Sequence, residues 1–455
     1  MLTRTFHLIS LGCSKNTVDS ESMAQLLQTE GYRPVAHPEE AEVIIVNTCG
    51  FIAPAREESL SVLREMAAQK RPGQVLIAAG CLTQRYGEQV ARQVPGVDGI
   101  LGARRWMDIL EVLRRLRRGS HPEPLYHLPP VPTVSQDDHG THRVSIQGGT
   151  AYLKIADGCR RPCAFCAIPL IKGTLVSRPL EAILDDARYV QDQGVEELIL
   201  IAQDTTDYGH DLGLKDGLAV LLEALLREVP DIPWIRVMYA YPGYVTDRLI
   251  EVMATYPQIL PYLDMPLQHA HPATLRRMRR PANIEWVYRT LEKMRRAMPD
   301  LALRTTFIVG YPGETEEEFQ TLLDFIAEMR FDRVGAFQFS FEPGTASESL
   351  GDPIPPEVKQ ARWERLMALQ QGISLEKNQA FVGRVLDVLI EGFDEEANLS
   401  IGRSYRDAPE IDGLVLVEGC YPAGQRLPVR VTGAMAYDLT GVAVSSSQAS
   451  RRKSA

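Results

Sequence analysis

The sequence predicts an α/β protein with three parts: an N-terminal doubly wound βαβ domain, a central partial (βα)6 barrel and a small C-terminal β-barrel. Strand-like and helix-like segments alternate over residues 4–119 and again over 145–375, which is typical of parallel sheets covered by helices. Over residues 378–445 the pattern changes to short apolar runs separated by Gly, Asn, Asp and Pro, as in small antiparallel barrels. The 455 residues, 45% of them hydrophobic, are enough for more than one buried core.

The first domain is predicted from three strand-like runs separated by amphipathic helical segments that begin near Asp19 and Pro54. The runs are Phe6–Leu11, Val43–Asn47 and Val75–Ala79. A βαβαβ order predicts a parallel sheet, in which the carboxyl ends of all strands lie at one edge. Residues 120–144 contain several Pro and His and show neither the helical nor the strand periodicity of apolar residues. They are predicted to form a linker.

The central domain is predicted from six strand-like segments with helical patterns in most of the gaps. They are Tyr152–Ala156, Glu197–Ala202, Trp234–Tyr239, Tyr262–Pro266, Leu303–Val309 and Arg333–Phe339. Such a series predicts an incomplete βα barrel whose working face lies at the carboxyl ends of the strands. A long helix from about Pro356 to Ala380 is predicted to close this domain.

The C-terminal domain is predicted to be a small OB-like barrel, because three short apolar runs are separated by turn residues. The runs are Val385–Ile390, Leu414–Val417 and Leu427–Val431. Cys420 stands alone here and is interpreted as a free thiol. The tail 446–455 is Ser-rich and basic, and is predicted to be disordered.

Composition narrows the class of protein. With 49 Lys and Arg against 59 Asp and Glu, the formal charge of −10 argues against binding to polyanions through net charge. No leader segment and no apolar run of about 20 residues is present, so we expect a cytoplasmic protein without a membrane partner. Seven Cys in such a chain indicate metal or redox chemistry better than a disulfide framework.

Three of the cysteines form a compact C-x3-C-x2-C motif directly after the first barrel strand: Cys159, Cys163 and Cys166. A structural zinc site or a ferredoxin-type cluster would require a fourth ligand at short spacing, and none is present. Three ligands leave one iron of a 4Fe-4S cluster open to a substrate or cofactor. We therefore predict an open-site cluster, with structural zinc or unrelated thiols as the alternatives.

A second triad, Cys13, Cys49 and Cys81, is dispersed over the first domain, but each member directly follows a predicted strand. In a parallel sheet the three thiols therefore lie at the same edge, where ligands bind in this architecture. Buried Cys also behaves as a small hydrophobic residue, so ordinary core cysteines are the alternative. Three of three at one edge favour a second cluster.

Three further features at predicted strand ends are weaker candidates. Gly310 begins a Gly-Tyr-Pro-Gly turn that permits close approach of a cofactor, although a plain β-to-α turn fits nearly as well. Asp204 ends the second barrel strand, where barrel enzymes place active-site residues, but Asp also caps helices. His269 follows the fourth strand, where a hydrogen-bonded structural histidine is the alternative.

The cysteine triad of the core, with aromatic Phe165 before its last Cys, resembles the signature of the radical S-adenosylmethionine superfamily. The whole chain is similar to the methylthiotransferases of that superfamily, in three parts and in order, from about Arg4 to Ser445. The segment from Ser10 to Asn16 with Asp19-Ser20-Glu21 resembles the start of their N-terminal domain, and the terminal barrel resembles their TRAM domain. Ser14, where many members have Pro, is a minor departure.

Within the family, three stretches are most similar to the branch that modifies an aspartate of ribosomal small-subunit protein twelve. They are residues 202–209, 338–345 and 402–413. The alternative is the sister branch, which 2-methylthiolates tRNA adenosines and is typically Asn-rich in the first stretch. A two-cluster electron-transfer protein is an alternative from another class, but it would need neither a barrel nor three-cysteine ligation. An RNA-binding module would leave both triads unused.

The resemblance implies two 4Fe-4S clusters and S-adenosylmethionine as cofactors. S-adenosylmethionine would bind the cluster of the core, in a pocket that includes Phe165, Asp204 and Gly310, and a reduced partner such as flavodoxin or ferredoxin would supply the electron that cleaves it. The resulting 5′-deoxyadenosyl radical would take hydrogen from the aspartate β-carbon, whose C–H bond no side-chain base can ionise. The N-terminal cluster would carry the sulfur.

The charge of the terminal barrel bears on the substrate. Residues 384–445 contain five Arg against ten Asp and Glu, a formal charge of −5. A surface that binds phosphates should be basic, so tRNA is not the expected partner. An acidic barrel suits a Lys- and Arg-rich ribosomal protein, and an ordinary solvated surface is the alternative.

Overall fold

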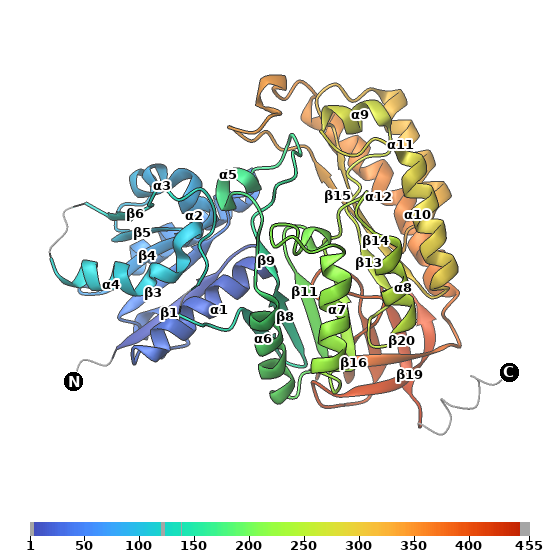
Figure 1. Ribbon diagram of the computed structural model, residues 1–455, viewed down its shortest axis with the longest axis horizontal. Helices are drawn as coiled ribbons and strands as arrows, with labels where there is room; N and C mark the ends of the chain where they lie inside the picture. The colour runs from blue at the N-terminus through green and yellow to red at the C-terminus, as the bar shows by residue number, and fades with distance from the viewer. Residues whose placement is uncertain (1–3, 120–122, 138, 446–455) are drawn as a thin grey trace.

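The computed structural model describes residues 4–119, 123–137 and 139–445. The N-terminal domain lies beside the central domain, and the C-terminal barrel lies below the central domain in the view of Figure 1. The predicted tail 446–455 lies outside the described residues. No helix in the described part of the chain is both long and apolar enough to cross a bilayer.

The N-terminal domain is built on a parallel sheet with the order β2-β1-β3-β4-β5-β6. Its strands are β1 (Thr5–Ser10), β2 (Arg33–Pro34), β3 (Val43–Thr48), β4 (Val75–Gly80), β5 (Gly99–Gly102) and β6 (Leu125–His127). The last strand differs from the sequence prediction, because it comes from the segment expected to be a linker. Its three residues pair with β5, which is too short a run to show a period of its own.

Helices cover both faces of this sheet. They are α1 (Ser14–Thr29), α2 (Ala53–Gln69), α3 (Cys81–Gln93) and α4 (Ile109–Arg117), with short 3-10 turns η1 (Pro38–Glu40) and η2 (Ala103–Asp108). One buried cluster joins Leu27 of α1 and Val112 of α4 to one face, and another joins Leu63 of α2 and Val90 of α3 to the other. The doubly wound prediction is confirmed, although α1 begins at Ser14 and not near Asp19.

The central domain contains six parallel strands in two hydrogen-bonded groups, β12-β11-β8 and β13-β14-β15. They are β8 (Thr150–Lys154), β11 (Glu197–Ile201), β12 (Trp234–Val237), β13 (Tyr262–Asp264), β14 (Ala302–Val309) and β15 (Arg333–Gln338). The two groups meet between β12 and β13, where isolated hydrogen bonds replace a regular ladder. One of them is the 2.9 Å hydrogen bond from Leu260 N to Ile235 O. Strand β7 (Val144–Gln147) adds an antiparallel edge, and β9 (Ala156–Asp157) pairs with β10 (Val176–Ser177).

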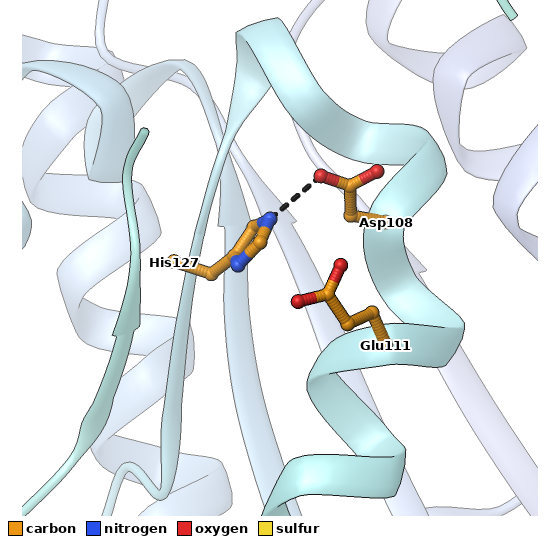
Figure 2. Close-up of side chains that lie close together, drawn as sticks. All are labelled: Asp108, Glu111 and His127. Carbon is orange, nitrogen blue, oxygen red and sulfur yellow. Dashed lines mark hydrogen bonds and ion pairs between the residues drawn. The ribbon is translucent and has the colours of Figure 1, made fainter. Parts of the chain in front are cut away.

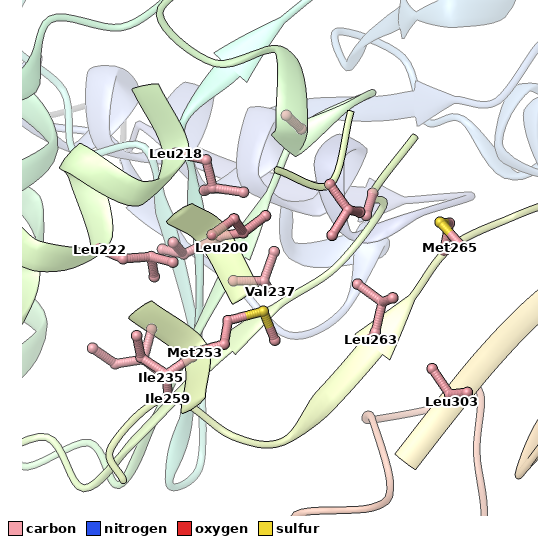
Figure 3. Packing of buried hydrophobic residues seen from close by; sticks show 14 of the residues in the cluster. Leu200, Leu218, Leu222, Ile235, Val237, Met253, Ile259, Leu263, Met265 and Leu303 are labelled. Carbon is pink, nitrogen blue, oxygen red and sulfur yellow. The ribbon is translucent and has the colours of Figure 1, made fainter. Parts of the chain in front are cut away.

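Helices surround the outside of this incomplete barrel. They are α5 (Ile168–Lys172), α6 (Leu180–Asp192), α7 (Gly217–Glu228), α8 (Asp247–Thr255), α9 (Pro272–Arg277), α10 (Ile284–Ala297), α11 (Glu316–Met329) and α12 (Pro356–Gln379), with turns η3 (Thr205–Asp207) and η4 (Glu348–Leu350). Figure 3 shows the core between sheet and helices, where Leu200 and Val237 meet Leu218, Leu222 and Met253. The partial barrel predicted from the sequence is confirmed.

Helix α1 of the N-terminal domain takes part in the barrel core. Val18 is completely buried in a cluster with Tyr152, Ile199 and Ile201, which lie on β8 and β11. The two domains therefore share a hydrophobic core.

The C-terminal domain is a closed five-stranded barrel in the order β16-β17-β18-β20-β19. Its strands are β16 (Val385–Asp394), β17 (Leu399–Ser404), β18 (Val415–Glu418), β19 (Arg426–Ala434) and β20 (Leu439–Ala443). The small barrel predicted from the sequence is confirmed.

The segment 402–413 of this barrel plugs the amino end of the central sheet. Arg403, which is fully buried, binds Glu197 at the start of β11 at 2.7 Å. Asp407 binds Arg333 at the start of β15, and the Tyr262 hydroxyl donates to Asp412 at 2.7 Å. The terminal barrel therefore lies at the opposite end of the strands from the cysteine motif that follows β9.

Candidate active site at the two cysteine triads

The first triad lies at one edge of the N-terminal sheet. The register aligns the strand ends that precede it, Ser10 with Asn47 and Asn47 with Ala79. Cys13 caps α1, Cys49 follows β3, and Cys81 opens α3. The expectation that all three strands end at the same edge is therefore confirmed. Their role as cluster ligands stays a prediction.

The loops of this edge are packed so closely that a side chain does not fit at Gly12. A Cβ atom built there would lie 2.8 Å from the Cβ and 3.1 Å from the Sγ of Cys49, and the φ angle of Gly12 is +96°. The Asn16 side chain ties the loops together, donating to Leu11 O at 2.7 Å and to Asn47 O at 3.1 Å. This packing fixes the positions of Cys13 and Cys49 relative to each other.

The second triad lies in the loop between β9 and α5. The loop is held by a 3.0 Å bond from Cys159 N to Gly173 O. Backbone N–H groups point at two of the sulfurs: Arg161 N lies 3.4 Å from Cys159 Sγ, and Ile168 N lies 3.5 Å from Cys166 Sγ. Such donors stabilise thiolate sulfur in iron–sulfur proteins.

Two arginines and a tyrosine, which the sequence interpretation did not single out, surround the middle cysteine. Arg280 Nη1 lies 3.6 Å and the Tyr241 hydroxyl 3.7 Å from Cys163 Sγ. The Tyr241 ring also packs against both guanidinium groups, with its centroid 4.1 Å from Arg280 and 4.6 Å from Arg161. Arg161 lies within the motif, between Cys159 and Cys163, but nothing in the sequence connects Arg280 with a loop more than 100 residues away. Arg280 is therefore the cation that approaches a sulfur of the triad, while Arg161 is paired with Asp204 and Asp207.

The cysteines of both triads must lose their protons before they can bind iron. Burial raises the pKa of Cys159 to about 11 and that of Cys81 to about 12, so neutral pH alone leaves these thiols protonated. A cation must displace the protons on binding. In the described part of the chain, one group of three possible metal ligands has all its ligand atoms within 4.8 Å of one another. This group is Asp108, Glu111 and His127 and contains no cysteine.

The two triads belong to domains that meet at α5. Ile171 of that helix packs in one small cluster with Cys81, Phe51 and Ala103 of the N-terminal domain. The next residue, Lys172, donates to Asp19 of α1 at 2.6 Å. The helix that follows the core cysteines therefore lies against the edge that carries the other triad.

Asp19 is the centre of a buried ionic network between the domains. Its carboxylate binds three cations of the core side, Lys172, Lys154 and Arg143, and the same cations reach Asp157. Burial acts to raise the pKa of Asp19, but the three cations hold it well below its usual range. Three cations against two carboxylates leave one positive charge in excess beside Cys81, which fits an anionic thiolate-bound cluster.

The three residues predicted to line a cofactor pocket lie on the same carboxyl face. Phe165 packs beside buried Tyr311 and Phe339, and Asp204 binds Arg161 at 2.6 Å. A Cβ at Gly310 would lie 2.4 Å from Cγ of Lys359, so a side chain of the protein itself occupies the space that this glycine leaves. Binding of S-adenosylmethionine by these residues stays a prediction.

His269 has structural partners on both ring nitrogens. Its Nε2 lies 3.1 Å from Glu314 Oε1, and its Nδ1 accepts from His271 N at 2.9 Å. Glu314 in turn binds Arg362 at 2.8 Å. The structural interpretation of this histidine is therefore the one that the contacts support.

Asp108, Glu111 and His127 form a group of possible metal ligands that includes no cysteine of either triad (Figure 2). Both oxygens of Asp108 accept from Arg105 at 2.7 Å, and His127 Nε2 lies 2.6 Å from Asp108 Oδ2. Arg115 lies 3.8 Å from Glu111 and 3.4 Å from His127 Nδ1. Two guanidinium groups already neutralise these carboxylates, so the group is a structural ion-pair cluster.

Comparison with known proteins agrees with this geometry. Residues 5–102 match the uncharacterized protein family UPF0004, 153–326 the radical SAM superfamily, and 382–444 the TRAM domain. The ribosomal protein uS12 methylthiotransferase RimO of Chloroflexus aurantiacus is 53% identical, over 97% of this chain and all of the relative. The RimO protein of Roseiflexus sp. (strain RS-1) is 51% identical over 96% of each chain. The chain belongs to the radical S-adenosylmethionine methylthiotransferases.

A solved structure supports the fold of this methylthiotransferase. The radical S-adenosylmethionine methyltransferase TsrM from Kitasatospora setae superimposes with a TM-score of 0.57 at 14% identity, over 76% of this chain and 74% of that one. The similarity concerns the architecture alone. The methylthiotransferase family assignment itself rests on the full-length relatives.

Proposed function

We propose that this protein transfers a methylthio group to the β-carbon of an aspartate in ribosomal protein uS12. The observation that carries the proposal is that Cys81 of one triad packs against α5, the helix that directly follows the other triad. Transfer of a sulfur group to an unactivated carbon requires both a hydrogen-abstracting radical and a sulfur carrier close together. The names of the full-length relatives, uS12 methylthiotransferases, support the choice of substrate.

Each triad would hold one 4Fe-4S cluster. Cys159, Cys163 and Cys166 would hold the cluster that binds S-adenosylmethionine, and Cys13, Cys49 and Cys81 the cluster that carries the sulfur. When bound, these groups supply the radical that removes hydrogen from the aspartate and the methylated sulfur that replaces it. An open iron on each cluster follows from three-cysteine ligation.

The protein's own residues prepare this site. Arg280 places a guanidinium nitrogen 3.6 Å from the sulfur of Cys163, where it would offset negative charge on a bound cluster. Phe165 packs with Tyr311 and Phe339 in an apolar cluster, which would help to keep water from a radical formed beside it. Asp204, fixed by Arg161, is the polar side chain of the predicted pocket for S-adenosylmethionine. Gly310 could contribute its backbone alone, because Lys359 fills the space beside it.

The expected partners follow from the chemistry and the charge. A radical enzyme of this class needs an electron donor, and we propose a small reduced protein such as flavodoxin or ferredoxin in the cytoplasm. tRNA is not proposed as substrate, because the terminal barrel stays acidic on its surface. In this barrel, the charged side chains that are at most 1% exposed number two Arg and two Asp, namely Arg403, Arg406, Asp407 and Asp412. They contribute no net charge, so the formal charge of −5 belongs to the remaining side chains.

Mass spectrometry of uS12 from cells with and without this enzyme tests the proposal. A mass increase of one methylthio group on an aspartate-containing peptide should be present only in cells with the enzyme. The purified holoenzyme should produce the same change on uS12 and leave tRNA adenosines unmodified. Methylthiolation of tRNA with no change in uS12 would assign the protein to the sister branch.

A further inference from the structure

Lys15 connects the two halves of the site. It lies in the first turn of α1, two residues after Cys13, yet its side chain is only 7% exposed. Its Nζ atom lies 3.2 Å from the ring centroid of Tyr239. Tyr239 follows β12 at the carboxyl end of the barrel, in a left-handed conformation with φ of +62°. The lysine therefore extends from the cysteine edge of one domain to the working face of the other.

The Lys15 ammonium has no carboxylate partner within ion-pair distance in the described part of the chain. The nearby acids are already occupied: Asp19 by three other cations, Asp204 by Arg161, and Asp264 by Arg304 at 2.8 Å. The face of Tyr239 attracts the cation but cannot accept its hydrogen bonds as an anion would. A nearly buried cation without a counter-charge is costly, so this position is expected to serve an anion that arrives from outside.

We propose that Lys15 binds the carboxylate of the substrate aspartate. This inference rests on the function proposed above, because the β-carbon that receives the methylthio group is bonded directly to that carboxyl carbon. Fixing the carboxylate through a charge-assisted hydrogen bond therefore fixes the reacting carbon to within one bond length. Tyr239 holds the ammonium from the barrel side, and the loop of Cys13 holds it from the sulfur side.

The same contact gives the site a means of selecting aspartate. An asparagine has the same shape but offers a neutral amide, which leaves the buried ammonium without a counter-charge. Lys15 is therefore a substrate-binding residue that determines specificity. The competing role is that of a counter-charge for the N-terminal cluster alone, which involves no preference between the two amino acids.

The test compares two synthetic peptides of uS12, one with the target aspartate and one with asparagine in its place. Binding to the anaerobic holoenzyme with S-adenosylmethionine is measured for the wild type, Lys15→Met and Lys15→Arg. Lys70→Met is the matched control, because Lys70 lies in the same domain and pairs with Asp98 at the other end of β4. The wild type and the control should prefer the aspartate peptide by about tenfold or more, the effect of one charge-assisted hydrogen bond.

Lys15→Met should abolish this preference, and Lys15→Arg should retain part of it, with iron content, the electron paramagnetic resonance signals of both clusters and affinity for S-adenosylmethionine unchanged. Full preference in Lys15→Met would overturn the proposal. So would equal binding of both peptides by the wild type, a result that needs no variant. Altered N-terminal cluster signals with full preference would assign the lysine to the cluster. If the wild type fails to modify the aspartate peptide at all, the proposed function itself is wrong.

Discussion

The Lys172 ammonium donates a 2.6 Å hydrogen bond to Asp19, and this contact joins the loop of the core cysteines to the domain that carries the other three. Because Lys154 and Arg143 bind the same carboxylate, relative movement of the two domains would expose several charges at once. The distance between the triads is therefore set by a buried network as well as by apolar packing.

Asp19→Asn should strongly destabilise the protein. The change removes one of two carboxylates that neutralise three buried cations, and loss of one partner from a buried ion pair costs about 3–5 kcal/mol. Urea denaturation of the variant should show this loss relative to wild type. Glu88→Gln is the control, because Glu88 is exposed and its ion pair with Arg92 is 4.0 Å long. A variant as stable as wild type would contradict the role given to Asp19.

Acid should loosen the attachment of the terminal barrel. Although burial acts to raise the pKa of Asp407, Arg333 and Arg406 hold it below its usual value. A carboxyl with a lowered folded-state pKa stabilises the fold above its unfolded pKa of about 4 and loses that effect as pH falls through the folded value. The melting temperature should therefore decrease as the pH is lowered below about 4. Asp407→Asn should reduce the slope of melting temperature against pH in that range. An unchanged slope would argue against the linkage.

The two triads should be separable by substitution. The reconstituted wild type should bind about eight irons, and replacement of Cys159, Cys163 and Cys166 by Ala should leave about half of them and no cleavage of S-adenosylmethionine. Replacement of the other triad should preserve cleavage to 5′-deoxyadenosine but abolish methylthio transfer. Iron analysis and product chromatography measure both. Thioether product from the N-terminal variant would show that its cluster is not the sulfur carrier.

Gly12→Ala should selectively damage the N-terminal cluster. The new methyl group would collide with Cys49, and the positive φ of this position costs a non-glycine residue about 1–3 kcal/mol more. Iron content should fall toward about four per chain while cleavage of S-adenosylmethionine persists. Gly31→Ala, which also has positive φ but open space around its Cβ, separates backbone strain from the collision. Equal iron loss in both variants would point to strain alone.

Reversing the charge of the exposed turn at Asp394, Glu395 and Glu396 should weaken capture of uS12. The effect should be largest at low salt, where screening of exposed charges is least. Binding measured at two ionic strengths gives the result. An affinity for uS12 that is independent of these charges at low salt would identify the acidic turn as ordinary solvated surface.

The sequence was sufficient for those features that depend on local pattern and strand direction. Cys13, Cys49 and Cys81 could be assigned to one edge because each directly follows an apolar strand and parallel strands end together. The sequence placed the start of α1 too late, because three consecutive polar residues, Ser14, Lys15 and Asn16, are typical of a loop. In the structure Asn16 lies within the helix, and its side chain donates to two backbone carbonyls.

Other features depend on partners too far apart in the chain for any local signal. Arg280 reaches Cys163 across more than 100 residues, and strand β6 is defined only by its neighbour β5. The segment 402–413 could be recognised by resemblance, but its polar letters do not reveal that Arg403 and Asp407 are buried against another domain.

Because of these buried contacts, the central domain depends on the terminal barrel for its stability. A fragment that ended before β16 would leave Glu197, Arg236, Arg304 and Arg333 without their counter-charges or carbonyl acceptors from the barrel, at the floor of an open sheet. The radical chemistry at one end of the strands thus depends for its scaffold on a domain at the other. Exchange of this domain between related enzymes would succeed only if its contacts with the floor were transferred together with its surface.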